Sequence, residues 1–303
     1  MPSSSFWTRE GNWYKGQFHT HTINSDGAAS PAEIVTSYRK RGYDFLAIAD
    51  HNRLTRVEKA PEGLLMISGE EITAGVAEMG GEFHFVAVNI KEAIDPKKYT
   101  SPQAIIDAVR AQGGGVIIAH PYWSALTLND MLPLHDYFGV EVYNSSCHYS
   151  IGKGNSANQW DDLLARNIRV YGFANDDAHH HCNDHRPDDV ANAYIMVKAA
   201  ACTTEHIMAA VAAGEFYACS GPGDGPVIKD FFIENGYAVA NTSKAKLVTI
   251  AADCGRGFGE SYAAAKRGLI TEATYKLRGR EKYVRLEVAD ADGKTAWSNP
   301  VFL

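Results

Sequence analysis

Cysteine is scarce in this sequence and shows no paired spacing. The 303 residues include five cysteines, an odd number: Cys147, Cys182, Cys202, Cys219 and Cys254. Because none of them forms a CxxC pair, the pattern argues against a disulfide framework and against a zinc site built from thiolates. We therefore expect free thiols in a reducing compartment.

Long apolar runs and an excess of basic residues are also absent. No stretch approaches the ~18 consecutive apolar residues of a membrane-spanning helix, and the first residues lack a basic region followed by an apolar run. Acidic residues outnumber Lys and Arg, 36 to 29, for a formal net charge of −7. Proteins bind long nucleic acids through clustered basic residues. Because this sequence is acidic, we expect no long nucleic acid as a partner. We expect a cytoplasmic protein with a small-molecule substrate and no membrane partner.

From residue 13 to about 200, short β-branched or aromatic runs alternate with helical patterns, which is typical of βα units around a parallel sheet or barrel. The predicted strands are 43–49, 64–68, 83–90, 116–119, 139–143 and 168–173. Ser30 and Ser101, each followed by proline, mark helix starts, and Gly42 and Gly113 lie where those helices should end. Two further helical patterns cover 157–166 and 204–213.

The character of the chain changes at 221–226, where glycine and proline alternate closely enough to end both helices and strands. Short alternating runs follow at 227–233, 246–251 and 283–288. We predict a large α/β domain over residues 1–222 and a small β-sandwich-like domain over 226–303.

Histidines and carboxylates gather where the predicted strands end, which is the ligand-binding face of barrels and open α/β sheets. His19 and His21 end the first strand, where alternation places both rings on one side, about 7 Å apart along the backbone. The other candidates are Asp26, Asp50, His51, Glu70, Glu71, His84, His120, Asp177 and His179.

Each of these residues has an ordinary structural interpretation. Two histidines on one strand are often hydrogen-bonded core residues, Asp26 is suited to a turn, and His84 or His120 alone could be a buried histidine with its own partners. Together, however, so many titratable groups would destabilise the fold unless cations neutralised the carboxylates. The combination predicts a metal centre.

These residues form motifs that resemble those of the PHP (polymerase and histidinol phosphatase) metallohydrolases. The motifs are His19-x-His21, Ser25-Asp26-Gly27, Asp50-His51-Asn52, Gly69-Glu70-Glu71, His84, His120-Pro121 and Asp177-x-His179, and they cover roughly residues 13 to 220. In addition, 214–217 with Ser220-Gly221-Pro222, and 292–300, are similar to the CehA/McbA-type members, which carry a C-terminal β domain.

The resemblance implies a distorted (β/α)7 barrel and two or three divalent metal ions. His19, His21, Glu71 and Asp177 would hold the first ion, Glu71, His84 and His120 the second, and Asp26, His51 and His179 the third. Glu71 rather than Glu70 matches the ligand position, and Asp50 would orient a ligand histidine. We assign Glu71, Asp177 and His179 as the catalytic residues.

A ligand set of nitrogen and oxygen suits Mn²⁺, Fe²⁺ or Zn²⁺ without distinguishing them. Two ions about 3.5 to 4 Å apart would lower the pKa of a bridging water and supply a hydroxide nucleophile. The leading hypothesis is hydrolysis of a small phosphomonoester or phosphodiester. A carbamate or amide hydrolase and a non-catalytic metal-binding module stay open, while a proofreading nuclease is disfavoured by the acidic charge.

Loop residues after the strands would choose the substrate. The candidates are Asn52, Arg53, Arg56, Tyr122, Trp123, Asn144, His148, Asn175 and Arg186. An arginine near the metals would favour a phosphate, although an exposed arginine is more often only solvated. His180, His181 and His185 could protonate a leaving group or be ordinary loop residues.

Overall fold

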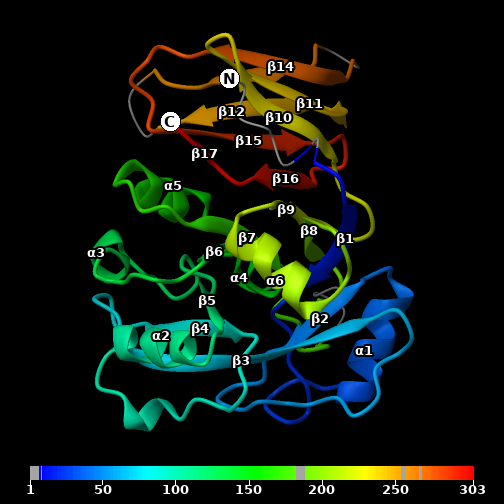
Figure 1. Ribbon diagram of the computed structural model, residues 1–303, viewed down its shortest axis with the longest axis vertical. Coiled ribbons are helices and arrows are strands. Elements are labelled where there is room, and N and C mark those ends of the chain that lie inside the picture. Colours follow the sequence, from blue (N-terminus) through cyan, green and yellow to red (C-terminus); the bar gives the residue numbers. More distant parts are fainter. Residues whose placement is uncertain (1–6, 8, 182–187, 254–256, 266–267) are drawn as a thin grey trace.

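The protein was analysed as a computed structural model that describes residues 7, 9–181, 188–253, 257–265 and 268–303 (Figure 1). Its larger part is a ring of strands. In chain order these are β1 (Asn12–Gln17), β2 (Phe45–Ile48), β3 (Leu65–Val76), β4 (Glu82–Val88), β5 (Gly115–Ile118), β6 (Gly139–Asn144) and β7 (Tyr171–Asn175). Each pairs with the next, and all pairs are parallel except β3–β4 and β4–β5.

The ring closes at the carboxyl ends of β1 and β7. Beyond β1 the backbone stays extended, and Thr20 forms a parallel bridge with Ala178. The N–H of His21 donates to the Ala178 carbonyl (2.8 Å), and the N–H of Asp177 donates to the His19 carbonyl (2.9 Å). The closing hydrogen bonds therefore belong to the residues predicted as metal ligands.

Helices cover the outside of the ring. They are α1 (Pro31–Lys40), η2 (Pro96–Lys98), α2 (Pro102–Ala111), α3 (Leu128–Met131), α4 (Ser145–Ile151), α5 (Ala157–Ala165) and α6 (Thr204–Ala212). The predicted helix boundaries are confirmed. Ser30 and Ser101 accept hydrogen bonds from the first turns of α1 and α2, and Gly42 and Gly113 follow with φ of 79° and 83°, a conformation that glycine adopts without strain.

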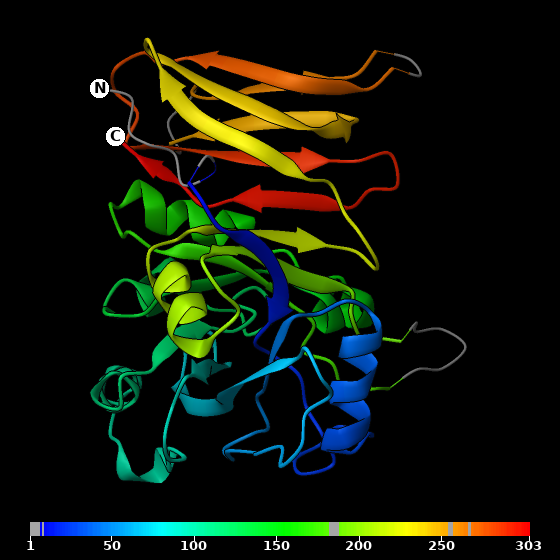
Figure 2. The same cartoon turned by 45° about the vertical axis from the view of Figure 1, so that its right-hand side comes forward.

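Strands make up the described part of the chain after residue 226. They are β10 (Ile228–Glu234), β11 (Tyr237–Ala245), β12 (Leu247–Ala252), β13 (Glu260–Ala263), β14 (Ile270–Lys276), β15 (Tyr283–Ala289), β16 (Thr295–Ser298) and β17 (Val301–Phe302). Figure 2 shows them stacked above the ring. They are not separated from it, because β16 pairs with β9 (Phe216–Ser220), which pairs with β8 (Ala193–Ala199), next to β1.

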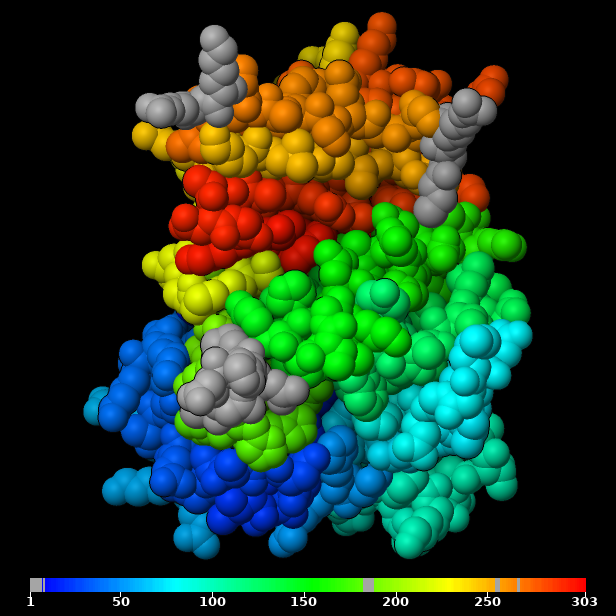
Figure 3. Space-filling model, turned by 180° about the vertical axis from the view of Figure 1, so that it is seen from behind, coloured from blue at the N-terminus to red at the C-terminus, as the bar shows by residue number. Residues whose placement is uncertain are grey.

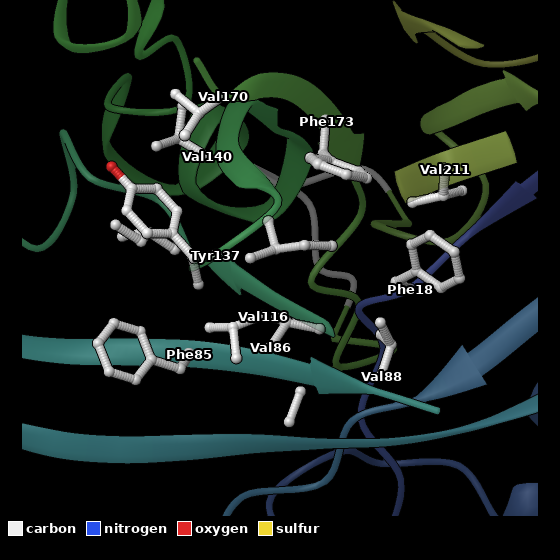
Figure 4. Packing of buried hydrophobic residues seen from close by; sticks show 14 of the residues in the cluster. Phe18, Phe85, Val86, Val88, Val116, Tyr137, Val140, Val170, Phe173 and Val211 are labelled. Atoms are coloured by element: carbon white, nitrogen blue, oxygen red, sulfur yellow. The ribbon is translucent and has the colours of Figure 1, made fainter. Parts of the chain in front are cut away.

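Apolar side chains from the strands of the ring and from the helices around it form one buried cluster. Phe18, Phe85, Val86, Val140 and Phe173 are fully buried there (Figure 4). Burying such a side chain contributes roughly 1.5–3 kcal/mol relative to leaving it exposed. A second cluster continues from the outer face of β2 and α1 into the C-terminal strands. The packed core therefore holds the carboxyl ends of the strands at fixed positions.

The structure corrects several details of the predicted architecture. It is a mixed α/β fold rich in parallel strands, but β4 runs antiparallel, and the chain between β2 and β3 forms no helix. β3 continues to Val76, so Glu70 and Glu71 lie inside the strand rather than at its end. β8, β9 and α4 were not predicted. Among the described residues, no helix combines the length and apolar character needed to cross a membrane.

Candidate metal centre

His19 and His21 lie directly after β1 and are fully buried. Their backbone is held by the hydrogen bonds that close the ring, and their Nε2 atoms are 3.1 Å apart. Two imidazole nitrogens at this separation point toward one small volume. The side-by-side placement expected from strand alternation is therefore present.

Glu71 and Asp177 complete the innermost group of ligand atoms. Glu71 Oε2 lies 3.2 Å from the Nε2 atoms of both His19 and His21, and Asp177 Oδ1 lies 2.9 Å from His21 Nε2. The donor atoms of His19, His21, Glu71 and Asp177 all lie within 4.8 Å of one another. The structure thus brings together the set that the resemblance implied for a first ion.

The remaining predicted ligands surround this group. His84 Nδ1 and His120 Nε2 lie 2.9 and 3.2 Å from Glu71 Oε1, while His51 Nδ1 lies 3.0 Å from Glu71 Oε2. Asp26 Oδ2 lies 3.4 Å from ring nitrogens of both His51 and His179.

The groups of donor atoms that lie close together differ slightly from the three ligand sets that the resemblance implied. His21, Asp26, His51 and His179 form one outer group, and His51, Glu71 and His84 form another, so His51 belongs to both. His120 is in neither group, although it contacts Glu71. Glu71 contacts more of the predicted ligands than any other described residue does, namely His19, His21, His51, His84 and His120.

The charges of this cluster fit cations. Burial by itself lowers the pKa of His21, but the neighbouring carboxylates of Asp177 and Glu71 outweigh burial and raise the pKa to about 9. Burial by itself raises the pKa of Glu71 and Asp177, yet the neighbouring His19 and His21 hold both well below the usual range. Cations bound at this cluster would compete with protons for the histidine nitrogens.

One buried carboxylate oxygen of the cluster fits a cation. Glu71 Oε2 is buried and makes no hydrogen bond, although histidine nitrogens lie 3.0 to 3.2 Å away. An unpaired buried carboxylate oxygen is costly, and a divalent cation bound there would satisfy it. The donor set, with imidazole and carboxylate but no thiolate, suits Mn²⁺, Fe²⁺ or Zn²⁺.

Glu141, which the sequence analysis missed, holds the cluster from one side. It lies in the middle of β6 and is fully buried. Its carboxylate is 2.7 Å from His19 Nδ1, and it accepts hydrogen bonds from the N–H of His120 (2.9 Å) and the side chains of Asn144 (2.8 Å) and Asn175 (3.0 Å). A carboxylate on the far ring nitrogen fixes a ligand histidine's tautomer and orientation. The sequence does contain a signal for this residue, because Glu141 is the one charged residue in the apolar run 139–143.

Asp50 does not have the role predicted for it. Its carboxylate accepts hydrogen bonds from Thr22, Ser25 and Thr55 and contacts no histidine ring. It holds the loop after β1, because strand alternation turns it away from the cluster that His51 faces. Its only link to a ligand passes through Ser25, whose Oγ is 3.4 Å from His21 Nδ1.

Asn144 and Asn175 are not free to contact a substrate. Asn144 donates to Glu141 and to Asp177 Oδ2 (3.2 Å) and caps α4 by accepting from the N–H of Cys147. Asn175 accepts from the N–H of Phe18 (2.9 Å) and donates to Glu141. Both are fully buried, so they orient ligand residues rather than bind substrate.

Other predicted substrate contacts lie elsewhere. Asn52 accepts a hydrogen bond from the N–H of Thr73, while Arg53 and Arg56 donate to the backbone carbonyls of Asn24 and Lys91. Tyr122 is half-exposed and does not line the pocket over the cluster, and His148 faces a different cavity. Arg186 and His185 lie outside the described residues, as do Cys182 and Cys254.

The pocket over the cluster measures about 480 Å³. Besides the ligands it is lined by Trp123, Ser146, Cys147, Ser150, Ile151 and His181. Trp123 stands edge-on to His120, with ring centroids 5.0 Å apart. Among the described lining residues there is no lysine or arginine, so the cationic groups of this part of the pocket are its histidines.

Comparisons with known proteins place this geometry in context. No family model matches the chain. The uncharacterised protein MJ1587 of Methanocaldococcus jannaschii is 30% identical over 143 residues, which cover 43% of this chain and 82% of that protein.

A solved structure shares the fold. A two-domain protein from Bacteroides vulgatus, described as containing a predicted PHP-like metal-dependent phosphoesterase, covers 97% of this chain and is itself covered over 95%, with a TM-score of 0.50 and 14% identity. A proposed metal-dependent phosphoesterase from Bifidobacterium adolescentis covers 57% of this chain and is covered over 92%, with a TM-score of 0.39 and 19% identity. The first of these shows that the two-part architecture recurs.

Proposed function

We propose a function from this premise: the chain belongs to the same family as the M. jannaschii protein MJ1587 and has the fold of the PHP-like proteins. It is a metal-dependent hydrolase, and more specifically a phosphoesterase for a small phosphomonoester or phosphodiester. The observation that carries the proposal is the buried cluster centred on Glu71, with an unpaired carboxylate oxygen among histidine nitrogens.

Two or three divalent ions held by this cluster would supply an activated water and stabilise negative charge on the substrate's oxygens. Glu71 would bridge ions, since its two oxygens face different histidines. Asp177 lies at the innermost group, with Asn144 fixing its second oxygen. His179, 19% exposed and steadied by its contact with the Asp177 carbonyl (2.7 Å), faces the pocket and is placed to meet substrate.

The proposal also covers the type of barrel, the subgroup, the domain boundaries, the cellular location and the nature of the substrate. The ring of strands corresponds to the distorted (β/α)7 barrel, and the chain to the CehA/McbA-type subgroup. Residues 1–222 and 226–303 are the two domains, the second a β-sandwich-like one in which β10, β11 and β14 face the other sheet. We also propose a cytoplasmic location and a small, phosphorylated substrate.

A carbamate or amide hydrolase is the second candidate, and one observation favours it. The described lining lacks the lysine or arginine that would pair with a phosphate, and it offers Trp123 and Ile151 as apolar contacts. Carbonyl substrates carry no charge before attack, so such a pocket suits them as well. Both reactions use the same cluster.

A substrate panel separates the candidates. The purified chain would be loaded with Mn²⁺, Fe²⁺ or Zn²⁺ in turn, and release of phosphate or alcohol from phosphoesters would be compared with release of product from aryl carbamates and amides. We expect phosphoester cleavage that is abolished by a chelator and by His84→Ala but kept by His135→Ala, because His135 is an exposed residue remote from the cluster.

Cleavage of carbamates or amides alone would replace the first candidate with the second. No cleavage of either class by fully loaded protein would support the non-catalytic module. Elemental analysis tests the centre itself, because less than one bound ion per chain after reconstitution contradicts a cluster with several ions.

A further inference from the structure

A second cavity, of about 420 Å³, lies on the other side of α4 from the metal centre. Its walls come from β6 and α4, from the turn after β9 and from the hairpin between β15 and β16. Figure 3 shows the face where these green, yellow and red segments of the chain meet. The segments include Ser220-Gly221-Pro222 and residues 292–297, which the proposed hydrolase function leaves unused.

Aromatic rings form one wall of this cavity. Tyr143 and Trp297 stack with centroids 5.9 Å apart and an interplanar angle of 22°. His148 lies 5.5 Å from Tyr143, and Tyr149 stands edge-on to His148 at 5.2 Å. Such a wall favours a flat aromatic ligand, which can stack or pack edge-on against several rings at once.

The charges around the cavity favour an anion. Lys294 is half-buried, and its Nζ donates to the carbonyl of Asp224 (3.1 Å), which leaves donor capacity for a ligand. Asp292 is exposed at the rim, where solvent screens its charge. The ammonium of Lys294 therefore acts on the interior more strongly than the carboxylate of Asp292 does.

Trp297 meets the cavity with its ring rather than with its N–H. The residue is 3% exposed and lines the cavity, whereas its Nε1 is itself out of reach of solvent and has no hydrogen-bond partner among the described residues. A ligand therefore packs against the edge of the indole ring.

Helix α4 separates this cavity from the metal pocket. Ser146, Cys147, Ser150 and Ile151 line the metal pocket, whereas His148 and Tyr149 line the cavity. The helix starts at Asn144, which caps it and also donates to Asp177 Oδ2. A ligand that shifts α4 would move a hydrogen-bond donor of a metal-binding carboxylate.

We propose that this cavity binds a small aromatic carboxylate, and that α4 couples its occupancy to the metal centre. The ring packs against Tyr143 and Trp297, and the carboxylate meets Lys294. Each site then alters the other's affinity by the same factor, as linkage requires.

The test uses the full chain loaded with Zn²⁺ and labelled with ¹⁵N in the tryptophan indoles, with benzoate and 2-naphthoate as probes. Trp297→Phe serves only to assign the Trp297 signal. We expect a saturable shift of that signal, with a Kd about tenfold weaker in Lys294→Met, because a charge-assisted hydrogen bond is lost. Lys229→Met, an exposed lysine on β10 outside the cavity, should leave the Kd unchanged.

The other outcomes contradict specific parts of the proposal. A shift of the Trp123 signal without Trp297 would mean that the carboxylate binds only at the zinc centre. Tighter binding of benzylammonium than of benzoate would reverse the assigned charge. Equal weakening in Lys294→Met and Lys229→Met, or no shift at millimolar probe, would remove the site.

Coupling has its own measurement, which does not depend on hydrolysis. Saturating benzoate should change the Zn²⁺ affinity by about fivefold or more, the lower end of typical coupling between sites. If the probe binds and the Zn²⁺ affinity stays unchanged, the proposed coupling is wrong, while the proposed binding site still stands. An inactive enzyme that still binds the probe would count against the proposed function alone.

Discussion

Glu141 holds a ligand histidine in place without being a ligand itself. Its carboxylate faces His19 Nδ1, which leaves His19 Nε2 directed at Glu71 and Asp177. The full negative charge matters here, because it stabilises the N–H form of Nδ1 and strengthens the basicity of Nε2.

Replacing Glu141 by glutamine should therefore weaken metal binding while preserving the fold. Glutamine has the same shape, but it removes the charge and turns one acceptor into a donor. We expect the Zn²⁺ affinity to fall about 10- to 100-fold. Competition against a chelator measures the loss, and Glu92→Gln, at an exposed position, is the control. Equal affinities in the two variants would show that the charge of Glu141 has no role.

At the residue scale, the sequence predicted the ligands but not the residues that orient them. His19, His21, Glu71 and Asp177 belong to residue types whose clustering is itself chemical evidence. Glu141 is a single carboxylate in an apolar strand, and its partners are distant in sequence. Asp50, predicted to orient a ligand histidine, reaches one only through Ser25, because its side chain points away from the cluster.

At the scale of elements, the buried strands with distinct apolar runs were predictable from the sequence. The direction of each strand within the sheet and the short helices were not. β2, β4, β5 and β6 lie within two residues of their predicted bounds. That β4 is antiparallel follows from the tight turn after β3, and α4 has only seven residues, too few for a helical pattern.

Close approach of β6 to β7 provides a test at this scale. A Cβ atom at Gly139 would lie 1.9 Å from the carbonyl oxygen of Tyr171, a backbone atom that cannot move aside alone. Gly139→Ala should therefore destabilise the protein by about 3 kcal/mol. Since the strands must separate, Glu141 should move and the Zn²⁺ affinity should fall as well.

Gly42→Ala is the matched control for this substitution. Its φ of 79° makes alanine strained, but no atom lies within 4 Å of the added Cβ. We expect a loss of about 1 kcal/mol and an unchanged Zn²⁺ affinity. Urea unfolding and chelator competition measure both quantities. If Gly139→Ala lost no more than Gly42→Ala, the contact between the two strands would not be as close as described.

At the scale of the molecule, the sequence indicated a change of character near residue 222 but not how the two parts join. The joining strands β9 and β16 are short, and their pairing connects residues about eighty positions apart, for example Ala218 and Trp297. Patterns read along the chain do not report such long-range register. The result is one continuous sheet from the metal centre to β13.

A buried ion pair also joins the two parts. Arg285 on β15 is 2% exposed, and its Nε donates to Asp161 of α5 (2.7 Å) while a second nitrogen pairs with Glu287. The guanidinium also stacks over Trp160, 4.9 Å from its ring centroid. Removing one member of such a pair leaves carboxylates beside a buried surface without their counter-charge.

Arg285→Met should therefore lower the free energy of unfolding by about 3 kcal/mol. We place the loss at the lower end for buried pairs, because the side chains of Asp161 and Glu287 are 24% and 30% exposed and keep some hydration. Arg280→Met removes an exposed arginine of the same region and should cost less than about 0.5 kcal/mol. Urea unfolding followed by circular dichroism compares the two. Because Arg285 ties α5 to β15, its loss should also separate the unfolding of the C-terminal strands from that of the ring, and a single unshifted transition would contradict this role.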